Sequence, residues 1–496
     1  MILEINFQKS IRYYLLLLIL LVFPIILANV YYIDDLTRAT HGYTFWGIDG
    51  RPMSDIAMIL FNFNGHLSDL APLPLLTSCV MLAISFSIFR WKFLDDSLKS
   101  FIIPISFLFS PFIFEPLTYR FDSLTITFSI FFCFLFLFIE LKNKIIELIL
   151  SGAAICFVYS FYQPSINIAA IFISIYFFYL LTKDIQAYEI IKKVSVKLLS
   201  LIFGTIVYML IILPSTHVND NASHHPGISN SIMDTILNNA NTYYIFFERN
   251  IIAENGKWLI IAFVSINIVS SIIISTKYHI RNISNSNKYV MLSILILSII
   301  VPFLSIIASM GSLLFLSNSL ETFARVYIGI NAYFLLTIFL LYKAVKLKTI
   351  PMIISIISTF YIFTFVYSYG NSLNMQNDMN KNVAIEFKDA TKNIKNESVK
   401  VIFNGESPKS PVFSNSSLNY PLLKTIVVDY YYNWLGPFRY MDLYGIKQIY
   451  PGVIQGELID YKNNFCEFEK IYKSQTFSIY KKDDYLIVDF SNKECK

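Results

Sequence analysis

The chain has 496 residues, of which 55% are hydrophobic and only 15% are charged, and its net charge is +5. A soluble protein carries about 25% charged residues, and one core could not bury this much apolar surface, so a soluble globular protein is excluded. The basic residues lie in short loops between apolar runs rather than in one patch, which argues against nucleic-acid binding.

Apolar runs predict about eleven transmembrane helices, since each span needs about 20 apolar residues. The run 101–114 is short and contains Pro104, and Pro111 follows, so we expect it to be broken or partly re-entrant. The first run follows basic residues, as a signal peptide does, but it is too long and lacks a cleavage site, so we expect a helix. In chain order the expected spans are 11–30, 71–89, 101–114, 123–141, 145–161, 165–181, 197–213, 258–275, 289–309, 326–342 and 350–369.

The distribution of Lys and Arg predicts the orientation of these helices, because cytoplasmic loops are richer in both. Alternate connections, starting with the N-terminus, hold most of the basic residues, so we expect a cytoplasmic N-terminus. An odd number of spans then places the polar tail outside the cytoplasm. The expected fold is mainly α, a polytopic membrane helical bundle over 1–369 with periplasmic loops, followed by a small soluble α/β domain over 370–496.

The first outer loop, 31–70, is the part of the chain richest in polar residues that could do chemistry. Asp34 and Asp35 follow the first helix, and Arg38 at i+3 and i+4 would share a helix face with both. Residues 52–63 form an amphipathic stretch suited to the membrane interface. The residues alone leave open a simpler interpretation, in which the acids only complement the N-terminal dipole of a juxtamembrane helix.

Further polar residues gather in other outer loops. Glu115, Arg120 and Asp122 lie between two spans, Gln163 lies in a tight turn, and Arg325 begins a late span at i+4 from Glu321. Each also has a simpler interpretation, as an ordinary turn or a surface ion pair. The pair His224–His225 lacks a third suitably spaced ligand, which favours a loop role over a zinc site.

The polar tail predicts a helix at 378–395, strands at 399–403 and 425–432, and a hairpin at 475–490. Its aromatic residues Tyr431 and Trp434 could stack on sugar rings, although aromatics are also common in strands. With His224 they are the weak candidates for acceptor binding. Cys466 and Cys495 could form a disulfide if the tail is outside the cytoplasm.

Four motifs together resemble one known family. They are YxxDDxxR at 31–38, GYxxWxxxGRP at 42–52, YRFDS at 119–123 and YQPSIN at 162–167. They look like the serotype-converting O-antigen glucosyltransferases of the GtrII type, over the membrane part of the chain. The tail contributes no motif.

The resemblance implies an enzyme of the bacterial inner membrane with a fold like the glycosyltransferase C superfamily. Such enzymes take glucose from undecaprenyl-phosphate-glucose on the periplasmic side and add it to an O-antigen sugar, with inversion. The expected catalytic pair maps to Asp34 and Asp35, one of which would take the acceptor proton. No metal and no further cofactor are expected. The residues expected at the donor phosphate and sugar are Arg38, Arg51, Arg120, Arg325, Asp122, Gln163 and Glu115.

Other function classes fit part of the pattern. A lipid-linked sugar flippase or secondary transporter would share the spans and outer cations, but no repeat between two halves is evident. An O-antigen polymerase or ligase also uses polyprenyl substrates, but it typically places its key residues in a large loop between late helices. A sensor or scaffold leaves the acids of the first loop unexplained.

Overall fold

The computed structural model describes residues 6–491 apart from ten gaps and divides into two compact units. The first, called the membrane unit, comprises Met1–Phe23 and Tyr43–Tyr367. The second, called the tail unit, comprises Pro24–Gly42 and Ser368–Lys496. The gaps are 217–226, 228, 230, 253–255, 283–287, 321, 395–399, 432–435, 447–463 and 484.

In the described residues, nine helices are long and apolar enough to cross a membrane, which confirms a polytopic helical bundle. They are α1 (Phe7–Ala28), α4 (Leu73–Phe93), α8 (Lys144–Phe161), α9 with its preceding turn (Gln163–Leu181), α10 to α11 (Ala187–Thr216), α13 (Gly256–Asn282), α14 (Lys288–Ala308), α15 with its preceding turn (Ala324–Ala344) and α16 (Thr349–Thr391).

The other two predicted spans are helical but differ from single full-length helices. The run 101–114 is a pair of helical segments, Leu98–Leu108 and Pro111–Thr118, bent by 66° at the break. The expected break is confirmed. The second segment begins at Pro111, and the proline ring explains the break because it removes a backbone N–H donor. The run 123–141 is α7 (Asp122–Phe138), a 17-residue helix shorter than a typical span.

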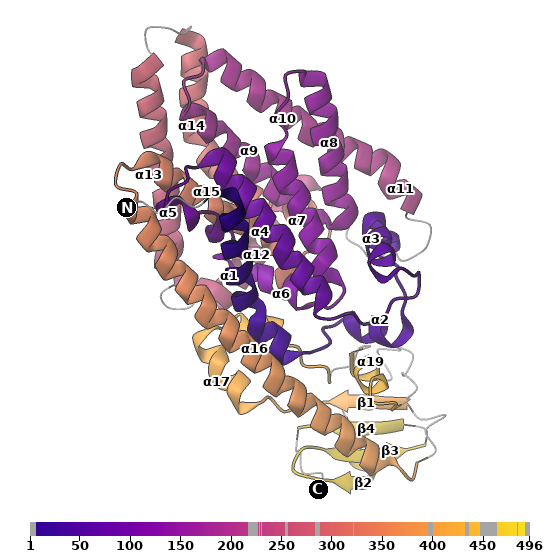
Figure 1. Ribbon diagram of the computed structural model, residues 1–496. Helices are drawn as coiled ribbons and strands as arrows, with labels where there is room; N and C mark the ends of the chain where they lie inside the picture. The colour runs from indigo at the N-terminus through magenta and orange to yellow at the C-terminus, as the bar shows by residue number, and fades with distance from the viewer. Residues whose placement is uncertain are drawn as a thin grey trace. The chain divides into compact units, whose positions relative to one another are not determined.

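The remaining helices are shorter. They are α2 (Asp35–His41), α3 (Pro52–Asn62), α5 (Leu98–Phe101), α6 (Phe114–Thr118), α12 (Ile232–Phe247), α17 (Pro411–Asn419), α18 (Leu423–Ile426) and α19 (Gly436–Asp442). Within the membrane unit α8 packs beside both α7 and α10 (Figure 1). Small residues allow the closest of these approaches, since a Cβ on Gly204 would clash with the Gly152 carbonyl oxygen.

Lysines from neighbouring helices satisfy the C-terminal end of α7. The Lys92 ammonium donates to the Phe138 carbonyl oxygen at 2.7 Å, and Lys197 donates to Ile139. Lys197 is only 1% exposed, and its Nζ lies 3.9 Å from Oε1 of the buried Glu147. Cations bound to the last carbonyls stabilise a helix end, which explains why α7 can stop short.

The same contact recurs elsewhere in the membrane unit. Arg281 donates to the Leu181 carbonyl oxygen at the end of α9, and Lys277 donates to Ala344 at the end of α15. Several basic residues that indicated the orientation therefore also hold helix ends in place.

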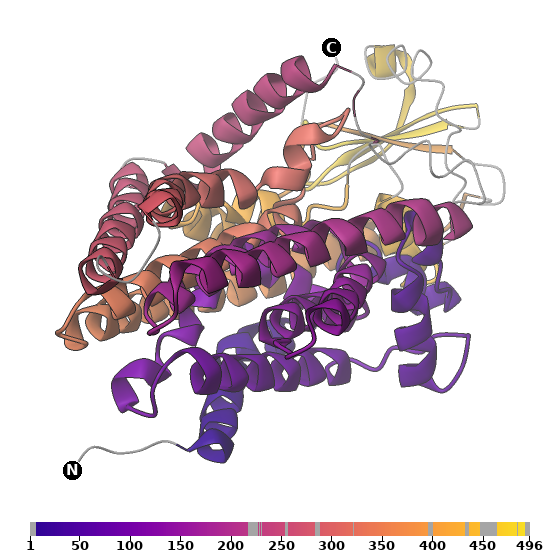
Figure 2. The ribbon, with the colours of Figure 1, turned by 90° about the horizontal axis from the view of Figure 1, so that it is seen from above.

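The tail unit contains a four-stranded sheet of order β1-β4-β3-β2, drawn in that order in Figure 1, while its strands overlap in the view of Figure 2. The strand β1 runs parallel to β4, and the pairs β4–β3 and β3–β2 are antiparallel. The expected hairpin and first strand are confirmed, and the helix expected at 378–395 is the last part of α16. The strands are β1 (Lys400–Asn404), β2 (Glu469–Lys473), β3 (Ser478–Lys482) and β4 (Tyr485–Asp489).

The prediction of a strand at 425–432 is wrong. The structure has the short helix α18 there, followed by an irregular segment. In that segment the Asp429 carboxylate accepts the N–H of Tyr431 at 3.1 Å, which is a local bond that competes with strand pairing.

The core of the tail unit includes a residue from the first loop. Leu36 of α2 is buried in one cluster with Phe387 of α16, Phe403 of β1 and Val488 of β4. The segment Pro24–Gly42 therefore folds with the C-terminal region, although the sequence placed it with the membrane helices.

Candidate active site

The two acidic residues of the first loop have different environments in the tail unit. Asp35 begins α2 and is 0% exposed, and its Oδ2 accepts the backbone N–H of Tyr32 at 3.1 Å. Asp34 is half-buried at the N-cap position, but its side chain makes no capping hydrogen bond to the helix. Both acids therefore lie at the N-terminus of α2, as the simpler interpretation expects, but Asp34 makes no side-chain bond to the helix. Arg38, one turn later, is buried.

Two tyrosines tie the backbone before these acids to the C-terminal region. The Tyr430 hydroxyl donates to the Tyr31 carbonyl oxygen at 2.6 Å and accepts the Ile33 N–H at 3.4 Å. The Tyr32 hydroxyl donates to the Ile426 carbonyl oxygen at 2.9 Å. The candidate catalytic segment is thus held by residues almost 400 positions away in sequence.

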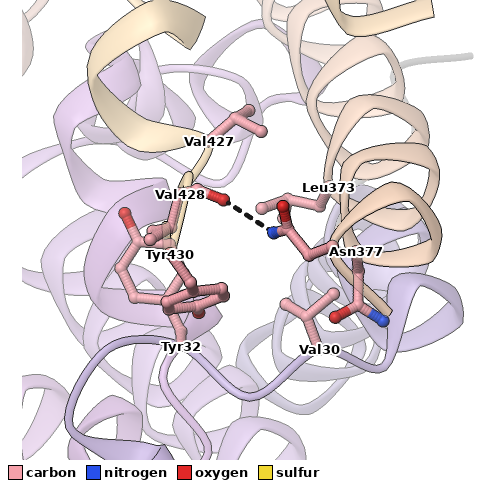
Figure 3. Close-up of a pocket in the computed structure, with 8 residues that line it drawn as sticks. Val30, Tyr32, Leu373, Asn377, Val427, Val428 and Tyr430 are labelled. Atoms are coloured by element: carbon pink, nitrogen blue, oxygen red, sulfur yellow. Dashed lines mark hydrogen bonds between the residues drawn. The ribbon is translucent and has the colours of Figure 1, made fainter. Parts of the chain in front are cut away.

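A small pocket with room for about one water molecule lies beside this segment in the tail unit (Figure 3). Two tyrosine rings and two asparagine amides contribute to its wall, and the Asn380 amide donates to the Val428 carbonyl oxygen at 3.3 Å. The lining residues are Val30, Tyr32, Leu373, Asn377, Asn380, Val427, Val428 and Tyr430.

The structure does not support Tyr431 as a stacking surface for sugar. Its side chain is 1% exposed, and its hydroxyl donates to the Asn380 carbonyl oxygen at 2.6 Å. Burial raises the pKa of Tyr431 well above its ordinary value. Tyr430 is the neighbour that reaches the pocket, and the sequence offered no signal to choose between them. Trp434 and His224 lie outside the described residues.

In the membrane unit, a buried tryptophan joins the first loop to α7. The Trp46 indole N–H donates to Oδ1 of Asp122, the first residue of α7, at 2.7 Å. An Arg51 nitrogen lies 3.6 Å from the same oxygen, and Arg51 also donates to Asp49 at 2.7 Å. Arg51 and Asp122 are therefore brought together as the sequence suggested, while Trp46, a position of the quoted motif, was not among the expected site residues.

The loop around Arg51 is held from two further sides. Oδ1 and Oδ2 of Asp55 in α3 accept the backbone N–H groups of Trp46 and Gly47 at 2.9 and 2.6 Å. The Gln163 amide donates to the Asp49 carbonyl oxygen at 2.7 Å. These bonds fix the loop backbone, so Gln163 acts on the loop itself.

Gly50 is required at the tightest point of this loop. Its φ is +75°, and a Cβ there would lie 2.7 Å from the Tyr208 hydroxyl oxygen, which donates to the Gly50 carbonyl at 2.8 Å. The sequence motif contained this glycine and gave no indication of Tyr208.

Arg325 forms a second cluster in the membrane unit. Its backbone N–H and its guanidinium donate to the two carboxylate oxygens of Glu115 at 2.5 and 3.3 Å, and Glu115 is 3% exposed. The guanidinium also donates to the Tyr119 hydroxyl and lies 5.2 Å from the centre of that ring. Arg325 and Glu115 are therefore brought together, whereas Glu321 lies outside the described residues.

Arg120 forms an ion pair with a residue that the sequence did not single out as a partner. Its guanidinium pairs with Asp69 at 2.5 Å. Across the described ranges, no group of three or more His, Cys, Asp or Glu side chains could hold a metal ion. The candidate site residues thus come from both units, the acidic segment from the tail unit and Arg51, Arg120, Arg325 and their partners from the membrane unit.

Comparison with known proteins places the chain in a family. One relative, from Salmonella phage P22, is an uncharacterized 55.3 kDa protein in the gtrB 5′ region. It is 30% identical over 254 residues, which are 50% of this chain and 52% of the relative, so the match spans about half of that protein. No solved structure matches the chain. Residues 23–377 match the family described as Glucosyl transferase GtrII, and the chain belongs to this glucosyltransferase family.

Proposed function

We propose that this protein transfers glucose from a polyprenyl-phosphate-linked donor to a sugar of the lipid-linked O-antigen, on the face of the membrane opposite the cytoplasm. The family match carries the proposal, because residues 23–377 include both the acidic pair and Arg325. The apolar helices support it, since a polyprenyl chain stays in the bilayer and its enzyme must be embedded there.

Asp34 is the proposed general base. It is half-buried and makes no capping bond, whereas Asp35 is fully buried and accepts a backbone N–H. In the proposed step Asp34 takes the proton of an acceptor hydroxyl as its oxygen attacks the anomeric carbon. The bond from that carbon to the phosphate oxygen breaks, polyprenyl phosphate leaves, and the configuration inverts. A positioned base contributes on the order of a hundred- to ten-thousand-fold.

Arg325 is the proposed group that stabilises the leaving phosphate, with Arg120, Arg51 and Arg38 as further candidates. Glu115 fixes the Arg325 side chain, and a guanidinium has five N–H donors, enough to bind a carboxylate and a phosphate oxygen together. Fixed donors aimed at developing charge lower the barrier without reorganising during the reaction.

The proposed side of the membrane draws support from the tail unit. Cys466 is disulfide-bonded, and Cys495, the partner expected from the sequence, lies outside the described residues. Disulfides persist in oxidising compartments and are rare in the cytosol. We therefore propose that the tail lies in the periplasm, that the N-terminus is cytoplasmic, and that the membrane is the bacterial inner membrane.

The test is glucosylation by the detergent-purified protein, supplied with undecaprenyl-phosphate-glucose and lipid-linked O-antigen. We expect Asp34→Asn to abolish transfer and Asp35→Asn to lower it together with protein stability. Full activity of Asp34→Asn would remove the proposed base. Glucose transfer without a membrane barrier excludes a flippase, and a branch glucose rather than a longer chain excludes a polymerase. An inactive wild-type protein would contradict the proposal.

A further inference from the structure

The backbone that carries the acidic pair is bound on both sides by one hydroxyl group. Tyr430 donates to the Tyr31 carbonyl and accepts the Ile33 N–H, so a single side chain spans the two peptide groups around Tyr32. Ile33 is the residue directly before Asp34 and has a positive φ of 47°. An isoleucine rarely adopts this conformation, so the surroundings must hold it there.

Tyr430 is itself fixed by the C-terminal region. Its ring stacks on Tyr440 with centroids 4.7 Å apart and planes inclined by 14°. The Tyr440 hydroxyl in turn donates to Asn377 of α16 at 3.0 Å. The hydroxyl that binds the acidic segment therefore has a defined position and is not a mobile surface group.

We propose that Tyr430 is a positioning residue, whose hydroxyl fixes the backbone that presents Asp34 to the acceptor. This inference rests on the proposed function, in which Asp34 is the base. It gives the tail a direct part in catalysis, because a residue far along the chain would set the placement of the base. Displacing a catalytic group by about 1 Å can cost about a hundredfold in rate.

The sharpest test compares two adjacent tyrosines. Tyr430→Phe removes the hydroxyl and leaves the ring in the pocket wall and on Tyr440. Tyr431→Phe is the matched control, since it also removes a 2.6 Å bond to a backbone carbonyl, and within the described part of the chain that hydroxyl bonds to Asn380 and not to residues 31–33. Both variants are made in the full chain, and melting temperature, kcat and acceptor KM are measured for each.

We expect both variants to lose melting temperature, because Tyr430→Phe loses the two bonds to residues 31 and 33 and Tyr431→Phe loses its buried bond to Asn380. Only Tyr430→Phe should lower kcat, by about ten- to a hundredfold, with acceptor KM changed less than threefold because the ring remains. A kcat for Tyr430→Phe that equals the Tyr431→Phe value would overturn the positioning role, since lost stability alone would then explain both.

Asp34→Asn in the same assay separates this inference from the proposed function. If Asp34→Asn is inactive while Tyr430→Phe keeps the control rate, Asp34 remains the base and the positioning role is wrong. If Asp34→Asn is fully active, both are wrong. An inactive Asp34→Asn with a kcat defect confined to Tyr430→Phe supports both.

Discussion

The Trp46 indole and the Asp122 carboxylate form a 2.7 Å hydrogen bond that joins the first loop to the first turn of α7. Both residues are buried. Asp122 also lies 3.6 Å from Arg51, so this one carboxylate connects the loop, a helix N-terminus and a candidate donor-binding cation.

Replacing Trp46 by Phe tests this connection. The variant keeps an aromatic ring but leaves the buried Asp122 without its indole donor, so we expect a loss of about 1–3 kcal/mol in unfolding free energy. Thermal unfolding in detergent measures it. The control is Trp258→Phe on an exposed face of α13, which should change stability by less than about 0.5 kcal/mol. Equal effects of the two variants would contradict the role of the bond.

The Glu115–Arg325 pair allows folding to be separated from activity. Arg325→Ala leaves a buried carboxylate unpaired and should cost about 3–5 kcal/mol. In the double variant Glu115→Gln, Arg325→Ala the buried charge is gone, so most of that stability should return. Glucosyl transfer should stay low in both variants, because the proposed phosphate ligand is missing. Recovery of transfer together with stability would show that Arg325 acts only through folding.

Lys197, which donates to the carbonyls at the end of α7, should contribute to the free energy of unfolding. Lys197→Met removes the donor to the α7 carbonyls, while Glu147 keeps its 2.7 Å pair with Lys144, so we expect a loss of about 1–3 kcal/mol. Lys192→Met is the comparison, because Lys192 and its partner Glu189 are both exposed and such pairs contribute about 0–1 kcal/mol. Unfolding followed by tryptophan fluorescence distinguishes them, and a small effect at Lys197 would show that the cap is dispensable.

Two glycine-to-alanine substitutions, at Gly50 in the Arg51 loop and at the open position Gly65, should differ in their effect on stability. Gly50→Ala places a methyl group 2.7 Å from the Tyr208 hydroxyl at a positive φ, so we expect a loss of at least about 1 kcal/mol. Gly65→Ala meets no heavy atom within 4 Å and should be close to neutral. Melting temperatures of the two variants give the comparison. If Gly65→Ala proved the more harmful, the described loop geometry would be wrong.

The sequence predicted the helices because each apolar run is a local signal. It also marked the break in the run 101–114 and the charged residues of both arginine clusters, since proline and charge are visible without knowledge of the fold. It could not pair Trp46 with Asp122, because buried tryptophans are common and nothing local selects a partner 76 residues away.

In the tail, local sequence patterns were less reliable predictors of the structure. Its apolar run at 425–432 looked like a strand, but a bond from Asp429 to the Tyr431 N–H favours an irregular path. Tyr430 and Tyr431 are adjacent and chemically identical, and only the path of the chain decides which reaches the pocket. The attachment of residues 31–33 to this path is a long-range contact with no local signature.

That attachment changes how exchanges between relatives should be designed. The piece that folds as the C-terminal region is discontinuous, since Leu36 completes its core and residues 31–33 bond to it. A hybrid joined only near Ser368 would put a foreign surface against Leu36 and Tyr31. A transplant that carries residues 24–42 along with 368–496 would keep both halves of that surface matched.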